Sequence, residues 1–215
     1  MKINDIMRRM GEEKLIAVLR LQGGLDTVLG TCEALLAGGV TIIEVTCGVP
    51  DALEAVRSLA AREDRSYLVG AGTVLDAATA EAMAEAGAEF VVSPAVIEEV
   101  IEASRRCGAA AIPGALTPTE VWHAHSLGAE AVKVFPASLL GPSYLRDLAA
   151  PLPGVRLIPT GGVDLDDLED FIAAGAFAVG VGSSLIDREA AARGDWEKVA
   201  ERAARFVRAA RGAPG

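Results

Sequence analysis

Short apolar runs alternate along the chain with longer segments in which apolar residues recur at helical spacing. Eight runs are rich in Ala, Val, Leu and Ile, as strands buried on both faces are. They begin at Ile16, Thr41, Tyr67, Phe90, Ala109, Ala131, Arg156 and Ala178. Amphipathic stretches lie between them, among them DTVLGTCEALLAGG, PDALEAVRSLAARE, DAATAEAMAEAGA and LDDLEDFIAAGA. This alternation predicts parallel strands joined by helical crossovers.

Eight strand–helix units predict an α/β fold, a compact (β/α)₈ TIM barrel with short loops. An open doubly wound sheet is the alternative that the same alternation allows. We expect residues 1–215 to form one domain, because neither a linker nor a change of composition divides the sequence. Residues 1–14 are predicted to form a helix across the N-terminal mouth of the barrel.

Several helix ends are readable from single residues. Thr117, Pro118 and Glu120 have the spacing of a capping box, with proline at the first helical position. Glycines predict left-handed C-terminal caps at Gly38-Gly39, Gly87, Gly108, Gly128 and Gly175.

Two charged residues lie in the interior of predicted strands, and not at their ends. Glu44 shares a strand face with Ile42 and Thr46, and Lys133 shares one with Ala131 and Phe135, whereas the opposite faces are apolar. Because strands under a helix layer turn their apolar face outward, both charges are predicted to point into the barrel. The two strands belong to the same alternating set, so the side chains are expected to meet near the axis.

Lysine is rare in this chain: four lysines stand against sixteen arginines, and the other three lie outside the predicted strands. A desolvated lysine can become a neutral nucleophile, which arginine cannot. Lys133 is therefore predicted to form a Schiff base with a carbonyl substrate, and Glu44, with a pKa raised by burial, to move protons. The alternative is a buried Lys133–Glu44 ion pair that only supports the barrel.

Polar and glycine residues gather at the ends of other strands, where barrel enzymes have their active sites. Glycine-rich turns after the last two strands fit a phosphate site; simple tight turns are the alternative. Arg20 ends the first strand and suits a carboxylate, although a structural ion pair would explain it equally well.

Composition and charge limit which partners, compartments and cofactors we expect for this chain. The net charge of −10 argues against a nucleic-acid partner. The charged N-terminal residues and the short apolar runs lead us to expect neither a signal peptide nor a membrane-spanning segment. The three scattered cysteines fit a reducing cytoplasm. His123 and His125 lie two residues apart on a predicted helix, so we expect neither a metal site nor a cofactor.

Seven segments together resemble the 2-keto-3-deoxy-6-phosphogluconate (KDPG) aldolases, the class I aldolases of the Entner–Doudoroff pathway. They are GGVTIIEVT, VGAGTVLD, FVVSPAV, IPGALTPTE, AVKVFPA, IPTGGV and VGVGSSL. The resemblance runs from about Ile16 to about Val207 and implies a homotrimeric (β/α)₈ barrel that cleaves KDPG to pyruvate and glyceraldehyde 3-phosphate. Some members also act on 4-hydroxy-2-oxoglutarate.

The resemblance also implies roles for individual residues. Lys133 resembles the Schiff-base lysine, Glu44 the general acid/base, and Thr73 and Pro94 residues lining the pyruvate end. The residues that resemble the phosphate cradle are Thr160, Gly161, Gly162, Gly182 and Ser183.

One position departs from the pattern. Many members carry an arginine for the substrate carboxylate shortly after the glutamate, where this chain has Gly48. Arg20 matches a variant in which the first strand ends on arginine, and we expect it to bind the carboxylate. The alternatives are the same chemistry on the galactonate epimer or on 4-hydroxy-2-oxoglutarate, a phosphate-binding isomerase or synthase, and a non-catalytic barrel that binds a phosphorylated ligand.

Overall fold

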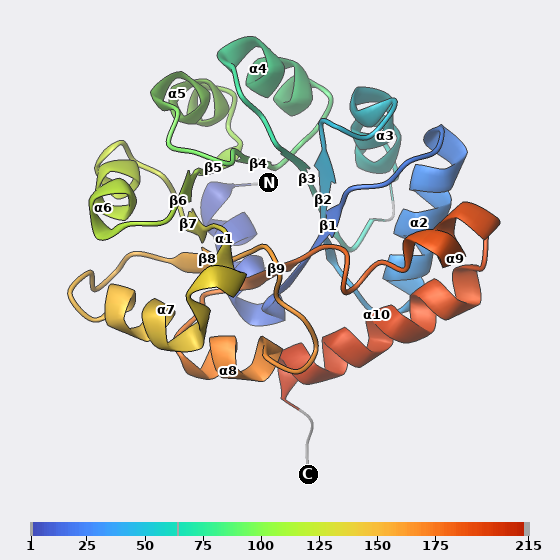
Figure 1. Cartoon of the computed structure of the whole chain (residues 1–215). Helices are drawn as coiled ribbons and strands as arrows, with labels where there is room; N and C mark the ends of the chain where they lie inside the picture. The colour runs from blue at the N-terminus through green and yellow to red at the C-terminus, as the bar shows by residue number, and fades with distance from the viewer. Residues whose placement is uncertain (1, 64, 213–215) are drawn as a thin grey trace.

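Parallel strands form a ring that is surrounded by helices, as Figure 1 shows in a view roughly along the axis of the ring. The structure is a computed structural model that describes residues 2–63 and 65–212. The strands are β1 (Leu15–Leu19), β2 (Ile42–Thr46), β3 (Leu68–Gly72), β4 (Phe90–Val92), β5 (Ala110–Ile112), β6 (Gly114–Ala115), β7 (Val132–Val134), β8 (Leu157–Pro159) and β9 (Val179–Val181). Each of the eight predicted runs contains at least one of these strands.

Most helices connect successive strands and lie outside the ring, whereas the first helix precedes the first strand and lies across one end of the ring (Figure 1). The helices are α1 (Ile3–Glu13), α2 (Leu25–Ala37), α3 (Ala52–Ala60), α4 (Ala77–Glu85), α5 (Glu98–Arg106), α6 (Pro118–Ser126), α7 (Gly141–Ala149), α8 (Leu168–Ala173), α9 (Arg188–Arg193) and α10 (Trp196–Arg211), with a short 3₁₀ turn η1 (Ala137–Leu139) before α7. Among the described residues, no helix combines the length and the apolar character needed to cross a bilayer.

The ring closes through two junctions. One sheet has the order β5-β4-β3-β2-β1-β9 and the other has the order β6-β7-β8. A parallel bridge between Thr160 and Gly180 joins them on one side. On the other side, the predicted run from Ala109 joins the two sheets, because its first part, β5, belongs to one sheet and its second part, β6, to the other. The two parts are separated at Pro113, whose missing N–H interrupts the ladder of hydrogen bonds. The (β/α)₈ barrel is therefore confirmed, and the open sheet is wrong.

Two apolar cores lie inside and outside the ring. Ile43, Val45, Val132 and Val134 pack in the outer core between the strands and the helices. The inner core holds side chains from the start of the strands, such as Ile42 and Phe90, together with residues of α1. The alternation of faces predicted for these strands is thus confirmed.

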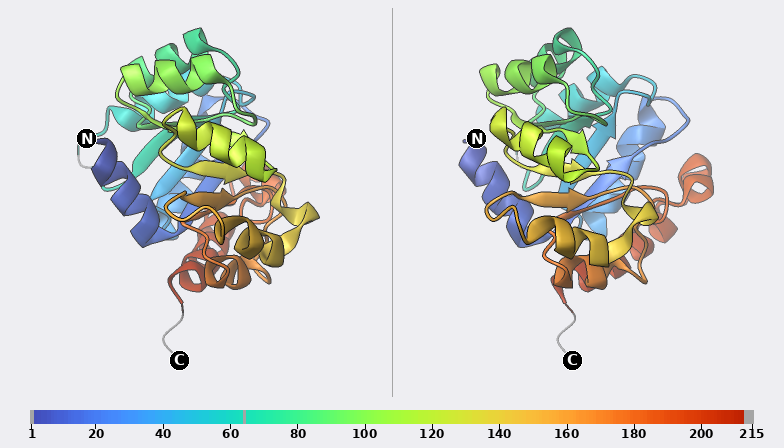
Figure 2. Two further views of the ribbon diagram at one scale, coloured as in Figure 1. Left: turned by 90° about the vertical axis from the view of Figure 1, so that its left-hand side faces the viewer. Right: turned by 60° about the vertical axis from the view of Figure 1, so that its left-hand side comes forward.

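Helix α1 lies across one end of the barrel, as the N-terminal mouth helix was expected to do (Figure 2). Its side chains Ile6, Met7 and Met10 are at most 1% exposed and belong to the inner core. Burial of such side chains contributes about 1.5–3 kcal/mol each. The helix therefore fills this end of the barrel and leaves the chemistry to the opposite end.

The predicted helix ends are largely confirmed. Thr117 and Glu120 form a reciprocal capping box at α6, with Pro118 in the first turn. Glycines take positive φ after the helices, with Gly87 at 104° as one example. Gly38 differs: its φ is −77°, and Gly39 alone of this pair is left-handed.

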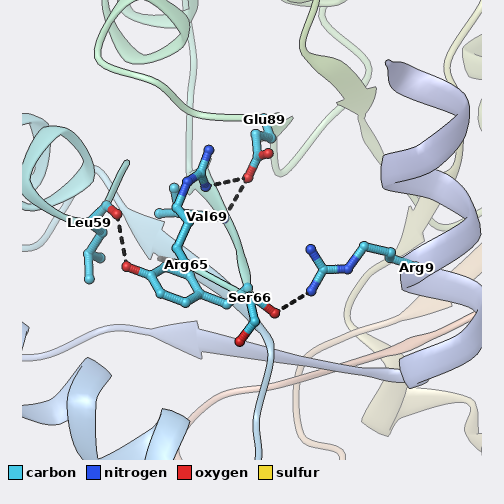
Figure 3. A network of polar contacts seen from close by, with 7 residues as sticks. Arg9, Leu59, Arg65, Ser66, Val69 and Glu89 are labelled. Carbon is cyan, nitrogen blue, oxygen red and sulfur yellow. Dashed lines mark hydrogen bonds and ion pairs between the residues drawn. The ribbon is translucent and has the colours of Figure 1, made fainter. Parts of the chain in front are cut away.

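A polar network ties α1 to the start of β3 (Figure 3). Arg9 donates to the Ser66 carbonyl at 2.6 Å. The Glu89 carboxylate accepts from Arg65 at 2.8 Å and from the Val69 N–H at 3.2 Å. Because these groups lie at the beginning of the strands, away from the strand ends where barrels carry their chemistry, we interpret the network as structural.

Candidate active site

A cavity of about 410 Å³ opens at the carboxyl ends of the strands. It brings together predicted residues from four different strand ends. Its lining residues are Val18, Arg20, Lys133, Phe135, Thr160, Gly161, Gly162, Val163, Asp164, Gly182, Ser183, Ser184 and Arg188. The lysine, the first-strand arginine and both glycine-rich turns thus share one site.

Lys133 lies in the wall of this cavity at the middle of β7. Its backbone N–H donates to the Pro113 carbonyl at 2.9 Å, which fixes the strand and points the side chain inward. Lys133 is only 6% exposed. Its Nζ lies 5.1 Å from the centroid of the Phe135 ring. Within the described chain no carboxylate lies within 4.0 Å of Nζ. The residue is therefore buried, lies beside an aromatic ring and lines the cavity.

Glu44, on β2, is 3% exposed and is not among the residues that line this cavity. Its Oε1 has no hydrogen-bond partner among the described residues. Burial raises the pKa of the Glu44 carboxyl, and the charges of Lys133 and Arg20 act in the opposite direction. Glu44 and Lys133 do not form a contact ion pair, because no carboxylate of the described residues lies within 4.0 Å of the Lys133 Nζ.

The space for this carboxyl is provided by Gly72 on β3. A β-carbon at position 72 would overlap Glu44 Oε1 and lie 2.5 Å from Cδ. Gly72 pairs in register with Thr46, two residues beyond Glu44, so the glutamate leans along its strand toward the mouth. The glycine is thus a steric requirement for the position of the carboxyl.

Thr73 follows β3 with φ at 59°, in the left-handed region that β-branched residues rarely adopt. Its Oγ1 accepts from Arg20 Nη2 at 3.5 Å, a long contact that brings the two residues together at the rim. Such backbone strain is common at functional sites. Arg20 itself is exposed, so its guanidinium is accessible from the cavity.

The two glycine-rich turns form the other end of the cavity. Gly161 and Gly162 both have positive φ, at 91° and 80°, and an added β-carbon would press on Phe135 at 2.9 Å or on Ser138 Oγ at 2.5 Å. In the described chain, the backbone N–H groups of Gly161, Gly162 and Ser183 donate to no backbone carbonyl. Unpaired N–H groups of this kind can bind an anion.

Three predicted residues, Glu44, Thr73 and Pro94, are not among those that line the first cavity. Pro94 lies at a different place. It lines a second cavity of about 360 Å³ with Gly114, Leu116 and His123, and this cavity shares Phe135 with the first. Across the described residues, no cluster of three or more metal-ligating side chains is present.

A model of the aldolase family described as "KDPG and KHG aldolase" matches residues 6–202. The chain belongs to this family. It is therefore an enzyme, a class I aldolase and a carbon–carbon lyase.

Relatives of this aldolase have more than one named substrate. It is 35% identical to the 2-dehydro-3-deoxy-phosphogluconate aldolase of Pseudomonas aeruginosa over 190 residues, which is 87% of this chain and 85% of that protein. It is 38% identical to the probable 2-dehydro-3-deoxy-6-phosphogalactonate aldolase of Rhizobium meliloti over 177 residues, 81% of this chain and 82% of that protein.

A solved structure of the family matches this aldolase along its length. The KDPG aldolase of Legionella pneumophila holds pyruvate captured at low pH as a covalent carbinolamine intermediate. The match has a TM-score of 0.84 and 28% identity, and covers 95% of this chain and 97% of that one.

The sequence did not reveal every residue that lines the site of this aldolase. Phe135 was placed on the inner face of its strand, but only the structure shows that its ring lies beside Lys133 and divides the two cavities. Asp164 and Arg188 lie in the loop after β8 and at the start of α9. No periodicity selects such positions, because their direction depends on how each loop folds.

Proposed function

We propose that this aldolase cleaves KDPG to pyruvate and glyceraldehyde 3-phosphate through a Schiff base on Lys133. The single observation that carries the proposal is the buried lysine in the wall of an anion-accommodating cavity, with no carboxylate within 4.0 Å of its Nζ in the described chain. A structural lysine at this depth would need such a partner, because an unpaired buried charge is costly.

The proposed reaction begins when Nζ of neutral Lys133 attacks the C2 ketone and forms a carbinolamine. Loss of water gives an iminium, which accepts electrons. Glu44 then removes the proton of the C4 hydroxyl, and the electrons of the breaking C3–C4 bond move into the iminium to give an enamine. Glyceraldehyde 3-phosphate leaves as the aldehyde.

The second half of the reaction returns the enzyme to its starting state. The proton held by Glu44 is delivered to C3 of the enamine, and hydrolysis of the resulting iminium releases pyruvate and Lys133. A carboxyl with a raised pKa suits a group that accepts and then donates a proton. Because Glu44 is not among the residues that line the cavity, a water molecule is proposed to carry the proton between it and the substrate.

The substrate is proposed to be held at both ends. Arg20, with Thr73 beside it, would bind the carboxylate in place of an arginine at position 48, where this chain has glycine. The N–H groups of Gly161, Gly162 and Ser183 would bind the distal phosphate, with Thr160 and Gly182 shaping the turns. Pro94 would contact the pyruvate methyl end through the second cavity, beside Phe135. Binding at both ends fixes the C3–C4 bond near Lys133.

The galactonate epimer is the second candidate substrate, favoured by the Rhizobium meliloti relative, which is named for it. The two substrates differ in configuration at C4, where the breaking bond and the proposed proton acceptor meet. Measuring kcat/KM with both epimers and with 4-hydroxy-2-oxoglutarate would identify the preferred substrate. We expect the highest kcat/KM with KDPG.

Covalent trapping tests the mechanism. The protein is incubated with pyruvate and borohydride, and the reduced adduct is located by peptide mass spectrometry. We expect one adduct, on Lys133, and none in Lys133→Ala, while Lys198→Ala, which removes an exposed lysine, leaves the labelling unchanged. An unlabelled Lys133 would mean that this aldolase does not form its Schiff base at Lys133.

We further propose a homotrimer in a reducing cytoplasm. Exposed apolar side chains include Trp122 on α6 at 56% exposure and Leu139 in η1 at 71%. Helices α6 and α7, the second of which follows η1, are neighbours in the ring (Figure 1). Exposed apolar side chains of this kind are typical of interfaces. Light scattering is expected to give three times the 22.2 kDa of the chain. Cys32, Cys47 and Cys107 are free thiols, which fits the compartment.

A further inference from the structure

Arg188 is a cation in the wall of the catalytic cavity that the reaction proposed above does not use. It is the first residue of α9 and lines the cavity together with Lys133, Gly162 and Ser183. The residue is exposed, so its guanidinium can move at the rim. It comes from the same connection as Ser183, five residues further along the chain.

The carboxylates next to Arg188 in sequence are engaged elsewhere. Asp187 caps α9 by accepting the Ala190 N–H at 2.9 Å and pairs with Lys198 at 2.8 Å. Glu189 pairs with Arg193 at 3.7 Å. Among the described residues Arg188 itself makes no ion pair within 4.0 Å and no hydrogen bond through its side chain. Its charge is therefore available to a ligand.

The cavity also has a feature that opposes anions. Asp164 lies in the same wall, and its Oδ1 accepts the Asp166 N–H at 2.9 Å, which keeps the carboxylate in the loop after β8. A negative charge there disfavours a phosphate bound at Gly161 and Gly162. A guanidinium at the same rim offsets this repulsion and adds two parallel donors of the geometry that phosphate oxygens accept.

We propose that Arg188 binds the distal phosphate of the substrate from the rim of the cavity and sets the preference for phosphorylated over unphosphorylated 2-keto acids. This inference rests on the proposed function. The backbone N–H groups of the glycine turns would hold the phosphate from one side, and Arg188 would close over it from α9. The residue is a binding group for the end of the substrate remote from Lys133, so its contribution lies in affinity and specificity.

The test compares two substrates that differ only in the phosphate. For Arg188→Gln, we expect kcat/KM with KDPG to fall roughly tenfold, mainly through KM, since one charge-assisted hydrogen-bonded contact at an exposed site is lost. With 2-keto-3-deoxygluconate, the same carbon chain without phosphate, kcat/KM is expected to be unchanged. Arg188→Lys should fall in between, because lysine keeps the charge but not the two parallel donors.

Arg193→Gln is the matched control. It removes the same charge from the same helix, outside the residues that line the cavity. We expect it to leave both substrates unaffected. Inorganic phosphate, used as an inhibitor, supplies a second probe: its inhibition constant should rise roughly tenfold in Arg188→Gln and stay constant in Arg193→Gln.

Two failures are distinguishable. If pyruvate and borohydride leave Lys133 unmodified, the proposed function is wrong. If the adduct forms but Arg188→Gln keeps its kcat/KM with KDPG, the proposed role of Arg188 is wrong. The same conclusion follows if kcat/KM falls equally with both substrates, or if Arg193→Gln lowers it as much as Arg188→Gln does.

Discussion

Replacing Gly72 by alanine tests whether the position of Glu44 governs the reaction. The added β-carbon would overlap Oε1 and lie 2.5 Å from Cδ and 2.7 Å from Cγ of Glu44. Carbon atoms pack at about 3.5–4.0 Å, so the carboxyl group has to retreat by about 1 Å. Gly72 is not among the residues that line the cavity at Lys133, and the three atoms nearest to the added β-carbon all belong to Glu44, so the variant is expected to act through the glutamate.

The expected magnitude follows from two separate effects. Overpacking a buried site costs about 1–3 kcal/mol of the free energy of unfolding. A displacement of a reacting group by about 1 Å can reduce the rate by about a hundredfold. We therefore expect Gly72→Ala to remain folded, with a kcat lowered by about a hundredfold and a much smaller change in KM.

The assay couples pyruvate release to a dehydrogenase, and urea unfolding measures the stability of the same preparation. Gly70→Ala is the matched control, because its β-carbon lies two residues earlier on β3 and meets the Phe90 ring at 2.5 Å instead of the carboxyl. It should lose a comparable amount of stability while its kcat falls far less. A folded Gly72→Ala with the wild-type kcat, or equal losses of kcat in both variants, would refute the role of this contact.

Two further predictions follow from the buried titratable groups. Because the pKa of the Glu44 carboxyl is raised above its ordinary 4.5, the folded state holds this proton to higher pH than the unfolded state does. Its contribution to stability is therefore complete below pH 4.5 and is lost as pH rises through the folded pKa. Urea unfolding should show Glu44→Gln gaining stability relative to wild type between pH 4.5 and pH 8; a constant difference would contradict this. Burial raises the pKa of the Cys32 thiol to about 12, so alkylation of the native protein at pH 8 should modify exposed Cys107 and leave Cys32 until unfolding, and equal rates would contradict this.

The sequence predicted the ring of strands because each strand of a parallel barrel is buried on both faces and reads as a short apolar run. Period-two alternation placed Glu44 and Lys133 inside the barrel, and the structure agrees. The same alternation could not tell a contact ion pair from an electrostatic coupling, since the separation depends on side-chain rotamers. In the structure, no carboxylate of the described residues lies within 4.0 Å of the Lys133 Nζ, so the contact ion pair is absent.

Other features of the site depend on contacts that a linear pattern does not encode. The break at Pro113 was hidden because proline ended an otherwise continuous apolar run. Gly72 appeared as one glycine among several at strand ends, and only its neighbour Glu44 gives it a role. Arg188 was missed because its place at the cavity is set by the turn that follows β9, not by strand register.

Helix α1, which fills the end of the barrel where the strands begin, has a consequence for the order in which products leave. In the described chain the cavity at Lys133 opens at the strand ends, and exposure rises from Lys133 toward Gly162 and Ser183. For the proposed reaction, the phosphorylated aldehyde lies between the cavity opening and the pyruvate fragment still bound to Lys133. Release is then ordered, aldehyde first and pyruvate last. Pyruvate should accordingly inhibit competitively with the sugar acid, whereas the aldehyde should inhibit noncompetitively.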